Sequence, residues 1–257
     1  MLTFVHSFAS EWLKRKRTAA AWLVVIGGFF IPLIILGARL YESGGLAAAN
    51  QHPRLWEMLY ERCWQFMGFF LLPMGVILAV SLVTQLEFRN NTWKQVFCTP
   101  QSLTTIFLAK LAIILVMLLQ FFFLFNIGIY LTGALPCLFF RDVHYPSAAF
   151  PFRLFLEGSG KFFLDALPIL GLQYLVSLRF KNFLVPLGVG MGLYVASFIA
   201  VHWKYGYFIP YTYCYYDFLG KRSPLPAGIS IHEWALGYFI GLTVLSYILY
   251  ISKKEKG

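Results

Sequence analysis

Long apolar segments that could each cross a lipid bilayer recur from one end of this chain to the other. A membrane-spanning helix needs about 20 mostly apolar residues. Because lipid cannot satisfy exposed backbone groups, such segments must be helices that close their own hydrogen bonds. The sequence therefore predicts an all-α integral membrane protein, with one transmembrane domain over residues 1–257. Its six expected transmembrane helices are 18–40, 63–86, 103–135, 162–178, 182–201 and 234–252.

Composition excludes an ordinary soluble protein. Apolar residues make up 59% of the chain, charged residues make up 12%, and the mean hydropathy is +0.68. A cleaved signal peptide is a rival interpretation of the first span, with Ala47-Ala48-Ala49 as a cleavage-like site. We favour a retained span, because the apolar stretch is longer than the usual signal-peptide core of about 7–15 residues.

The positive charge is concentrated on one side of the expected topology. If the N-terminus is cytoplasmic, the inner segments carry twelve lysines and arginines against three acids, Glu11, Glu87 and Glu255. The outer segments carry nine basic residues and eight acids. The positive-inside rule then predicts that both termini are cytoplasmic. The net charge of +10 indicates topology and not nucleic-acid binding.

Residues 1–17 predict an amphipathic helix that lies in the membrane interface. A basic run, Lys14-Arg15-Lys16-Arg17, separates it from the first span. Lys110, near the start of the third span, is expected to snorkel to the cytoplasmic surface. The apolar face of the helix would hold Val5, Phe8, Ala9, Trp12 and Leu13, and the opposite face His6, Ser7, Ser10 and Glu11.

A polar segment, 87–102, separates the second and third spans on the expected cytoplasmic side. Asn90-Asn91 can cap the start of a helix, and Pro100 would end it. Between them, Trp93 and Phe97 are spaced to share one helical face. The sequence therefore predicts a short helix with an aromatic face at the membrane surface. It is either a docking element for a partner or an ordinary loop.

Polar side chains inside the expected spans are candidates for a transport path. Hydrogen bonding between helices or at the interface is the alternative, and we favour it. The fifth span also carries a GxxxG pattern, Gly188 to Gly192, which is a weak indication of close helix packing between two subunits. The intramembrane polar residues are Gln120 and Asn126 in the third span and Asp165 and Gln173 in the fourth.

Enzymatic and metal-binding motifs fail when tested. The run from Gly158 to Lys161 resembles a nucleotide-binding loop, but Phe155 stands at the first glycine position. His232-Glu233 begins like a zinc-protease helix, yet Leu236 replaces the second histidine. A disulfide between Cys137 and Cys214 is possible, but ordinary apolar packing of the cysteines is favoured. The sequence indicates no catalytic centre and no metal site, so any ATPase would be another polypeptide.

The expected outer loops are long, at about 41–62, 136–161 and 202–233. The last is rich in tyrosine, tryptophan and phenylalanine. It is either a gate or lid over a substrate path or an aromatic belt at the membrane interface, and we favour the belt.

Two segments carry a resemblance to a known family. The first is residues 11–17, before the first span. The second runs from Glu87 through Asn91, Thr92, Trp93 and Lys94 to Pro100 and leads to Lys110. Both resemble the corresponding segments in the permease subunits of type-2 ATP-binding-cassette exporters. The similarity is greatest to the lantibiotic-immunity and bacitracin-type permeases. The family commonly has glycine before the threonine, where this chain has Asn91.

The resemblance implies a multi-pass protein of the bacterial cytoplasmic membrane that exports a peptide, antibiotic or lipid-like compound. Residues 87–102 would be the coupling helix, and the first and fifth spans would contact a second permease, either identical or a related sister. ATP and Mg²⁺ would bind a separate cassette ATPase, and lipid would surround the spans. The implied ATPase-docking residues are Glu87, Asn91, Thr92, Trp93, Lys94 and Phe97.

Two other function classes stay open. One is a membrane anchor or sensor of a resistance module that transports nothing. The other is an intramembrane enzyme, which would need a cluster of polar side chains within the spans. The few intramembrane polar residues argue against the enzyme.

Overall fold

The computed structural model describes residues 2–16, 18–89, 102–203, 205–219 and 228–252. Within those ranges the chain is helical, joined by short turns and loops. Its elements are α1 (Leu2–Lys16), α2 (Ala19–Tyr41), η1 (Ser43–Gly45), α3 (Leu46–Asn50), α4 (Leu55–Phe66), η2 (Met67–Leu71), α5 (Leu72–Arg89), α7 (Leu103–Ala134), α8 (Pro136–Phe139), α9 (Phe152–Arg179), α10 (Leu184–Ala200), η3 (Gly206–Phe208), η4 (Pro210–Thr212), α11 (Tyr213–Leu219) and α12 (Ile231–Ser252).

Five helical segments of the described chain are long and apolar enough to cross a membrane: Ala19–Tyr41, Leu55–Leu86, Leu103–Ala134, Phe152–Arg179 and Ile231–Ser252. The all-α integral membrane class is thereby confirmed. The sixth expected span, 182–201, corresponds to α10, which is apolar but has only 17 residues. The six-span count therefore stays a prediction.

Two spans extend beyond the expected segments. The segment expected at 63–86 lies inside a helical stretch that begins at Leu55, and the one expected at 162–178 lies inside α9, which begins at Phe152. Charged residues such as Glu61 and Glu157 interrupt the apolar pattern there. Glutamate favours a helix as strongly as leucine does, so these residues lower hydropathy without ending the helix.

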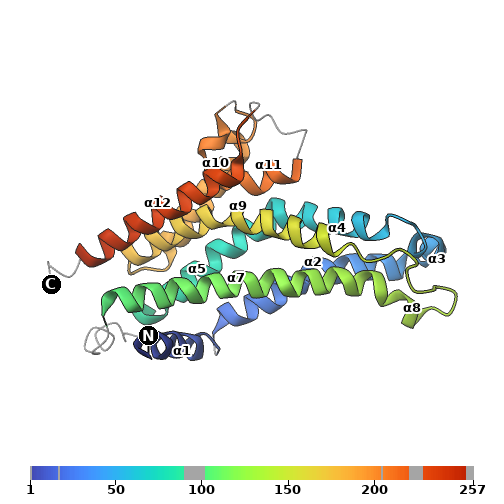
Figure 1. The fold of residues 1–257 in the computed structure, drawn as a ribbon, viewed down its shortest axis with the longest axis horizontal. Helices are drawn as coiled ribbons and strands as arrows, with labels where there is room; N and C mark the ends of the chain where they lie inside the picture. Colours follow the sequence, from blue (N-terminus) through green and yellow to red (C-terminus); the bar gives the residue numbers. More distant parts are fainter. Residues whose placement is uncertain (1, 17, 90–101, 204, 220–227, 253–257) are drawn as a thin grey trace.

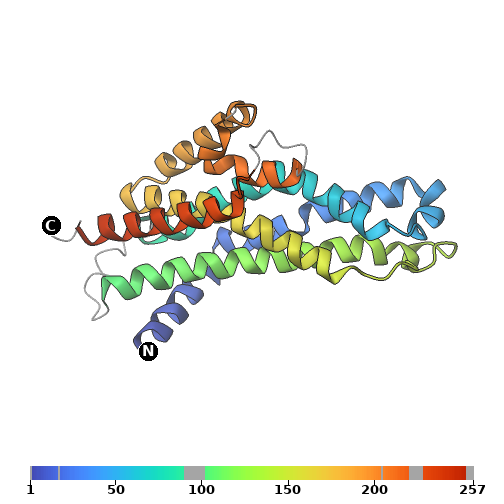
Figure 2. The same ribbon diagram turned by 45° about the horizontal axis from the view of Figure 1, so that its top comes forward.

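The long helices form an elongated bundle with both chain termini at one end (Figure 1). α2 packs along α7, α9 packs along α5 and α12, and α1 lies against the start of α7. Figure 2 shows α10 leaning away from the other helices. Only one stripe of α10 is buried, and it includes Pro186, Gly190 and Tyr194. Its opposite face, with Leu184, Val195 and Ile199, is exposed.

A π-helical turn, η2, joins α4 to α5 directly before Pro73. Proline has no backbone N–H, so the carbonyl of Phe69 loses its usual helical donor. The Tyr194 hydroxyl of α10 donates to that carbonyl at 2.6 Å. The proline-induced irregularity therefore creates a point of attachment for α10.

The centre of the bundle is aromatic. The Trp64 ring of α4 stacks on Phe162 of α9, with centroids 3.9 Å apart and planes 3° apart, and meets Phe125 of α7 edge-on at 4.9 Å. A side chain at Gly68 would collide with the Phe162 ring. This packing fixes the positions of α4, α7 and α9 relative to one another.

The aromatic segment after α10 folds into a small packed cap in its described part. Tyr213 and Tyr216 are buried, and their hydroxyls donate to the backbone carbonyls of Tyr207 and Val201. The rings of Tyr207 and Phe208 both meet Trp234 edge-on. The segment is thus attached to the start of α12.

Candidate functional site

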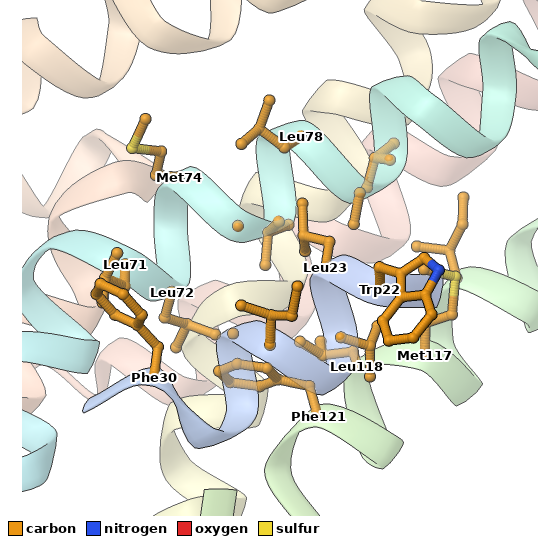
Figure 3. A pocket seen from close by; sticks show the side chains of 18 of the residues that line it. Trp22, Leu23, Phe30, Leu71, Leu72, Met74, Leu78, Met117, Leu118 and Phe121 are labelled. Atoms are coloured by element: carbon orange, nitrogen blue, oxygen red, sulfur yellow. The ribbon is translucent and has the colours of Figure 1, made fainter. Parts of the chain in front are cut away.

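An apolar groove of about 580 Å³ opens between α2, α5 and α7 (Figure 3). α2 contributes Trp22 and Phe30, which are 67% and 47% exposed, and α7 contributes Met117 and Phe121. All the residues that line it have hydrocarbon, aromatic or thioether side chains or are glycines. Such a surface binds apolar groups through van der Waals contact, and its side chains offer few polar atoms to orient a polar ligand.

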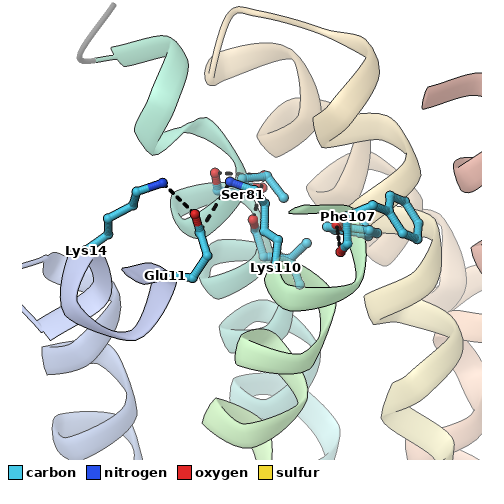
Figure 4. A network of polar contacts seen from close by, with 8 residues as sticks. Glu11, Lys14, Ser81, Phe107 and Lys110 are labelled. Carbon is cyan, nitrogen blue, oxygen red and sulfur yellow. Dashed lines mark hydrogen bonds and ion pairs between the residues drawn. The ribbon is translucent and has the colours of Figure 1, made fainter. Parts of the chain in front are cut away.

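Buried charges join α1 to α7 at the end of the bundle that holds the termini. Figure 4 shows Lys14 and Lys110 pointing toward Glu11. The Lys110 ammonium lies 3.4 Å and the Lys14 ammonium 2.5 Å from the Glu11 carboxylate. One turn further along α1, Arg15 donates to the Gln120 side-chain oxygen at 3.0 Å and lies over the Trp12 ring at 4.0 Å. Two contacts with α7 therefore fix α1.

The N-terminal helix turns part of its polar face toward the protein. Its polar stripe of Ser7, Glu11 and Arg15 is buried against the protein, whereas Val5 and Leu13 are 60% and 66% exposed. The physical reason is that Glu11 and Arg15 find charged or polar partners on α7, while lipid can cover the apolar side chains.

The expectation for Lys110 is wrong. The side chain does not snorkel to the surface, because it is only 3% exposed and faces Glu11. An ion pair within the protein replaces hydration of the ammonium group.

Two of the other intramembrane polar residues bind neighbouring helices. The Asn126 amide of α7 donates to the Ser159 hydroxyl of α9 at 2.8 Å. The Gln173 amide of α9 donates to the Ser81 hydroxyl of α5 at 2.7 Å and to the Pro186 carbonyl of α10 at 2.8 Å. Gln173 therefore connects three helices.

Asp165 is fully buried in α9, and one of its oxygens lies 2.9 Å from Nδ1 of His232, in the first turn of α12. The structure does not bring the four path candidates together. Gln120 contacts α1, Asn126 and Ser159 border a separate groove of about 710 Å³ between α7 and α9, and Gln173 is enclosed by α5 and α10. A role for these residues in transport stays a prediction.

Gly188 and Gly192 lie on the exposed face of α10, and a side chain at either position would meet nothing within 4 Å. Gly190, between them, faces the bundle instead. A Cβ at Gly190 would collide with the Gln173 amide and with Ile77. The contact of Gly188 and Gly192 with a second subunit stays a prediction, while Gly190 packs within the chain.

We expect Gly190→Leu to lower the free energy of unfolding by at least roughly 2 kcal/mol, because an overpacked helix contact must open. The double variant Gly188→Leu/Gly192→Leu should keep the monomer's thermal stability and weaken dimers. Thermal unfolding and crosslinking in detergent would measure both effects. Equal destabilisation by the two variants would contradict the assignment of the faces.

The expected coupling segment, 87–102, lies largely outside the described residues, because residues 90–101 are not among them. Its described flanks are the last turn of α5 and the start of α7. Ser102 caps α7, since its hydroxyl accepts from the backbone N–H of Thr105 at 3.1 Å.

Glu11, Arg15 and His232 bind partners on other helices that were not predicted from the sequence. Ser7, Glu11 and Arg15 recur at intervals of four, which is a detectable stripe of polar residues. Nothing comparable marks His232, since its partner Asp165 lies 67 residues away in the sequence.

Comparison with known proteins gives one match. The family model described as ABC-2 family transporter protein matches residues 7–197, from α1 to α10. No curated protein and no solved structure matches the chain.

Proposed function

Because the chain belongs to the ABC-2 family of transporter proteins, we propose that it is the permease subunit of an ATP-driven exporter. The family match over residues 7–197 is the observation that carries this proposal. The chain is a multi-pass membrane protein and a membrane component of an ABC transporter, not itself the catalytic component. Its proposed setting is the bacterial cytoplasmic membrane.

The proposed assembly contains a second permease and separate cassette ATPases that bind ATP and Mg²⁺. The second permease is either another copy of this chain or a related sister. Residues 87–102 are the proposed coupling element, with Glu87, Asn91, Thr92, Trp93, Lys94 and Phe97 as its contacts to the ATPase.

The connections of this segment support a coupling role. It joins α5 to α7, and α7 carries Lys110 near its start, where Glu11 attaches α1. A force applied by a partner at this segment would therefore act on α1, α5 and α7 at once. Two of these helices, α5 and α7, also line the 580 Å³ groove.

The apolar lining of that groove supports a cargo with a large apolar part. The proposed cargo is a peptide, antibiotic or lipid-like compound whose apolar part lies against Trp22, Phe30 and Phe121. Gln120, Asn126, Asp165 and Gln173 lie apart from one another in the described structure, so these four residues do not together form a catalytic cluster. A membrane anchor or sensor that transports nothing is the second candidate.

Reconstitution tests the proposal. The chain would be co-expressed with a cassette ATPase encoded beside it, purified and placed in vesicles. We expect the ATPase to co-purify, its hydrolysis of ATP to depend on this chain, and a labelled apolar peptide to accumulate across the membrane with ATP. Co-purification without ATP-dependent movement of any tested apolar cargo would favour the sensor.

We expect cytoplasmic termini, from the excess of Lys and Arg on that side. In a variant without native cysteines, single cysteines at exposed Gly44 and Arg141 should react with an impermeant maleimide added outside whole cells. A cysteine at exposed Lys181, between α9 and α10, should react only after permeabilisation. Labelling of position 181 from outside would reverse the orientation.

A further inference from the structure

Three ligand-type side chains from separate helices meet where α12 begins, beside α9 and α11 (Figure 1). They are Asp165 of α9, Asp217 of α11 and His232 of α12, and one ligand atom from each lies within 4.8 Å of the others. His232 Nδ1 is 2.9 Å from Asp165 Oδ1, and His232 Nε2 is 3.8 Å from Asp217 Oδ1. Both nitrogens of one imidazole therefore face a carboxylate.

One oxygen of this cluster has no hydrogen-bond partner among the described residues. Asp165 is 0% exposed, and within the described part of the chain its Oδ2 atom has no hydrogen-bond donor. A buried, unsatisfied carboxylate oxygen is costly, since it has lost its water without a replacement. This oxygen is an independent sign that the cluster accommodates a further positive ligand.

The charge of the cluster points the same way. Two ionised carboxylates beside a neutral imidazole carry a charge of −2, and protonating His232 leaves −1. A divalent cation in place of that proton would bring these three side chains to neutrality, and Lys161 is a further positive charge near them.

We propose that Asp165, Asp217 and His232 bind a divalent transition-metal ion of the Zn²⁺ class. One imidazole nitrogen and two carboxylate oxygens form a ligand set that Zn²⁺ accepts, with water at the remaining position. A separation of 3.8 Å between His232 Nε2 and Asp217 Oδ1 suits two ligands of one ion, because each bond is about 2.0–2.2 Å long. Because Asp165 Oδ1 already pairs with His232 Nδ1 on the other side of the ring, Asp165 would supply the third ligand through its unpaired oxygen, Oδ2.

The site is reachable and would have a structural effect. His232 and Asp217 are 28% and 16% exposed, so an ion can enter from their side and reach Asp165 at the base. Bound there, it would join the start of α12 and the cap helix α11 to α9. Asp217 and His232 lie beyond the residues that the family model matches, whereas Asp165 lies within them. The proposed metal site does not rest on the proposed transport function.

The test uses the full chain, purified in detergent, treated with EDTA and then dialysed against Zn²⁺ alone. We expect one Zn²⁺ per wild-type chain. Asp165→Asn, Asp217→Asn and His232→Asn should each weaken binding by at least ~10-fold, since the loss of even an outer-shell partner costs about that much. Asp142→Asn and His202→Asn change the same residue types at exposed positions and should leave binding unchanged.

Two further measurements separate ligation from a purely structural role. Co²⁺ in place of Zn²⁺ should give visible absorption bands in wild type and in both control variants, but not in the three ligand variants. Zn²⁺ should raise the melting temperature of wild type and of both control variants. The ligand variants that fold should show no such rise. Binding should weaken from about pH 7.5 to about pH 5.5, because protons compete for imidazole and carboxylate.

Loss of Zn²⁺ binding in any ligand variant that keeps its elution profile and its metal-free melting temperature would support the site. Should Asp165→Asn fail to fold, the half-buried Asp217 and His232 positions carry the test. Absence of stoichiometric Zn²⁺ binding by wild type, or equal affinity of the ligand variants and the controls, would overturn the proposal.

Discussion

Glu11→Gln is expected to destabilise the protein by roughly 3 kcal/mol, because it removes one partner of a buried ion pair. Glu11 and Lys110 are 6% and 3% exposed, so water cannot readily replace the lost carboxylate. The buried ammonium would face a neutral amide across the α1–α7 contact. The midpoint of thermal unfolding in detergent measures the loss.

A double variant separates this effect from loss of packing. Glu11→Gln/Lys110→Met removes both charges and should recover at least half of the lost stability, since a buried pair can often be replaced by apolar groups at little cost. Glu57→Gln provides the matched control. Glu57 pairs with Arg54 at 2.6 Å, but the two side chains are 44% and 65% exposed, and such surface pairs contribute about 0–1 kcal/mol.

A larger shift for Glu11→Gln than for Glu57→Gln, with recovery in the double variant, would establish that burial makes the pair important. Equal shifts for the two single variants would show that α1 is held by its other contacts. The Arg15–Gln120 hydrogen bond would then be the first of these to examine.

The spans could be predicted because hydropathy acts locally. A run of apolar residues becomes a helix in lipid whatever its neighbours are, so α2, α7 and α12 match their expected segments closely. The helices α4 and α9 extend beyond the predicted spans, and hydropathy could not predict these extensions. Their charged residues lower hydropathy, while aromatic packing between the two helices continues into the extensions, where Tyr60 meets Phe155 edge-on.

The contacts between helices depend on pairings that a single sequence does not display. Asp165 was recognisable as an unusual intramembrane charge, but its partner His232 lies next to Glu233 at the start of α12, before a long apolar run. The two could be matched only once α9 and α12 were known to pack together. The same holds for Gly190, whose contact with Gln173 differs from the outward placement of Gly188 and Gly192.

Trp93→Ala/Phe97→Ala is expected to abolish retention of the cassette ATPase. These residues lie outside the described structure, and the prediction rests on their spacing of four, which places both rings on one face of a helix. Buried aromatic residues at the centre of an interface often contribute at least ~2 kcal/mol each, roughly thirtyfold in affinity. Glu87→Gln and Lys94→Gln should have smaller effects, because rim charges mainly steer association and are screened by salt.

The competing interpretation is that Trp93 only anchors the segment at the lipid headgroups, as interfacial tryptophans commonly do. Docking predicts that the double variant inserts in normal amounts and still dimerises, but elutes without the ATPase during affinity purification. Anchoring predicts poor insertion or a lower melting temperature, with the ATPase bound to whatever protein survives. Because the Glu87 and Lys94 variants change the same segment without removing an aromatic ring, they control for general disturbance. Full ATPase recovery with a well-inserted double variant would refute docking through these two rings.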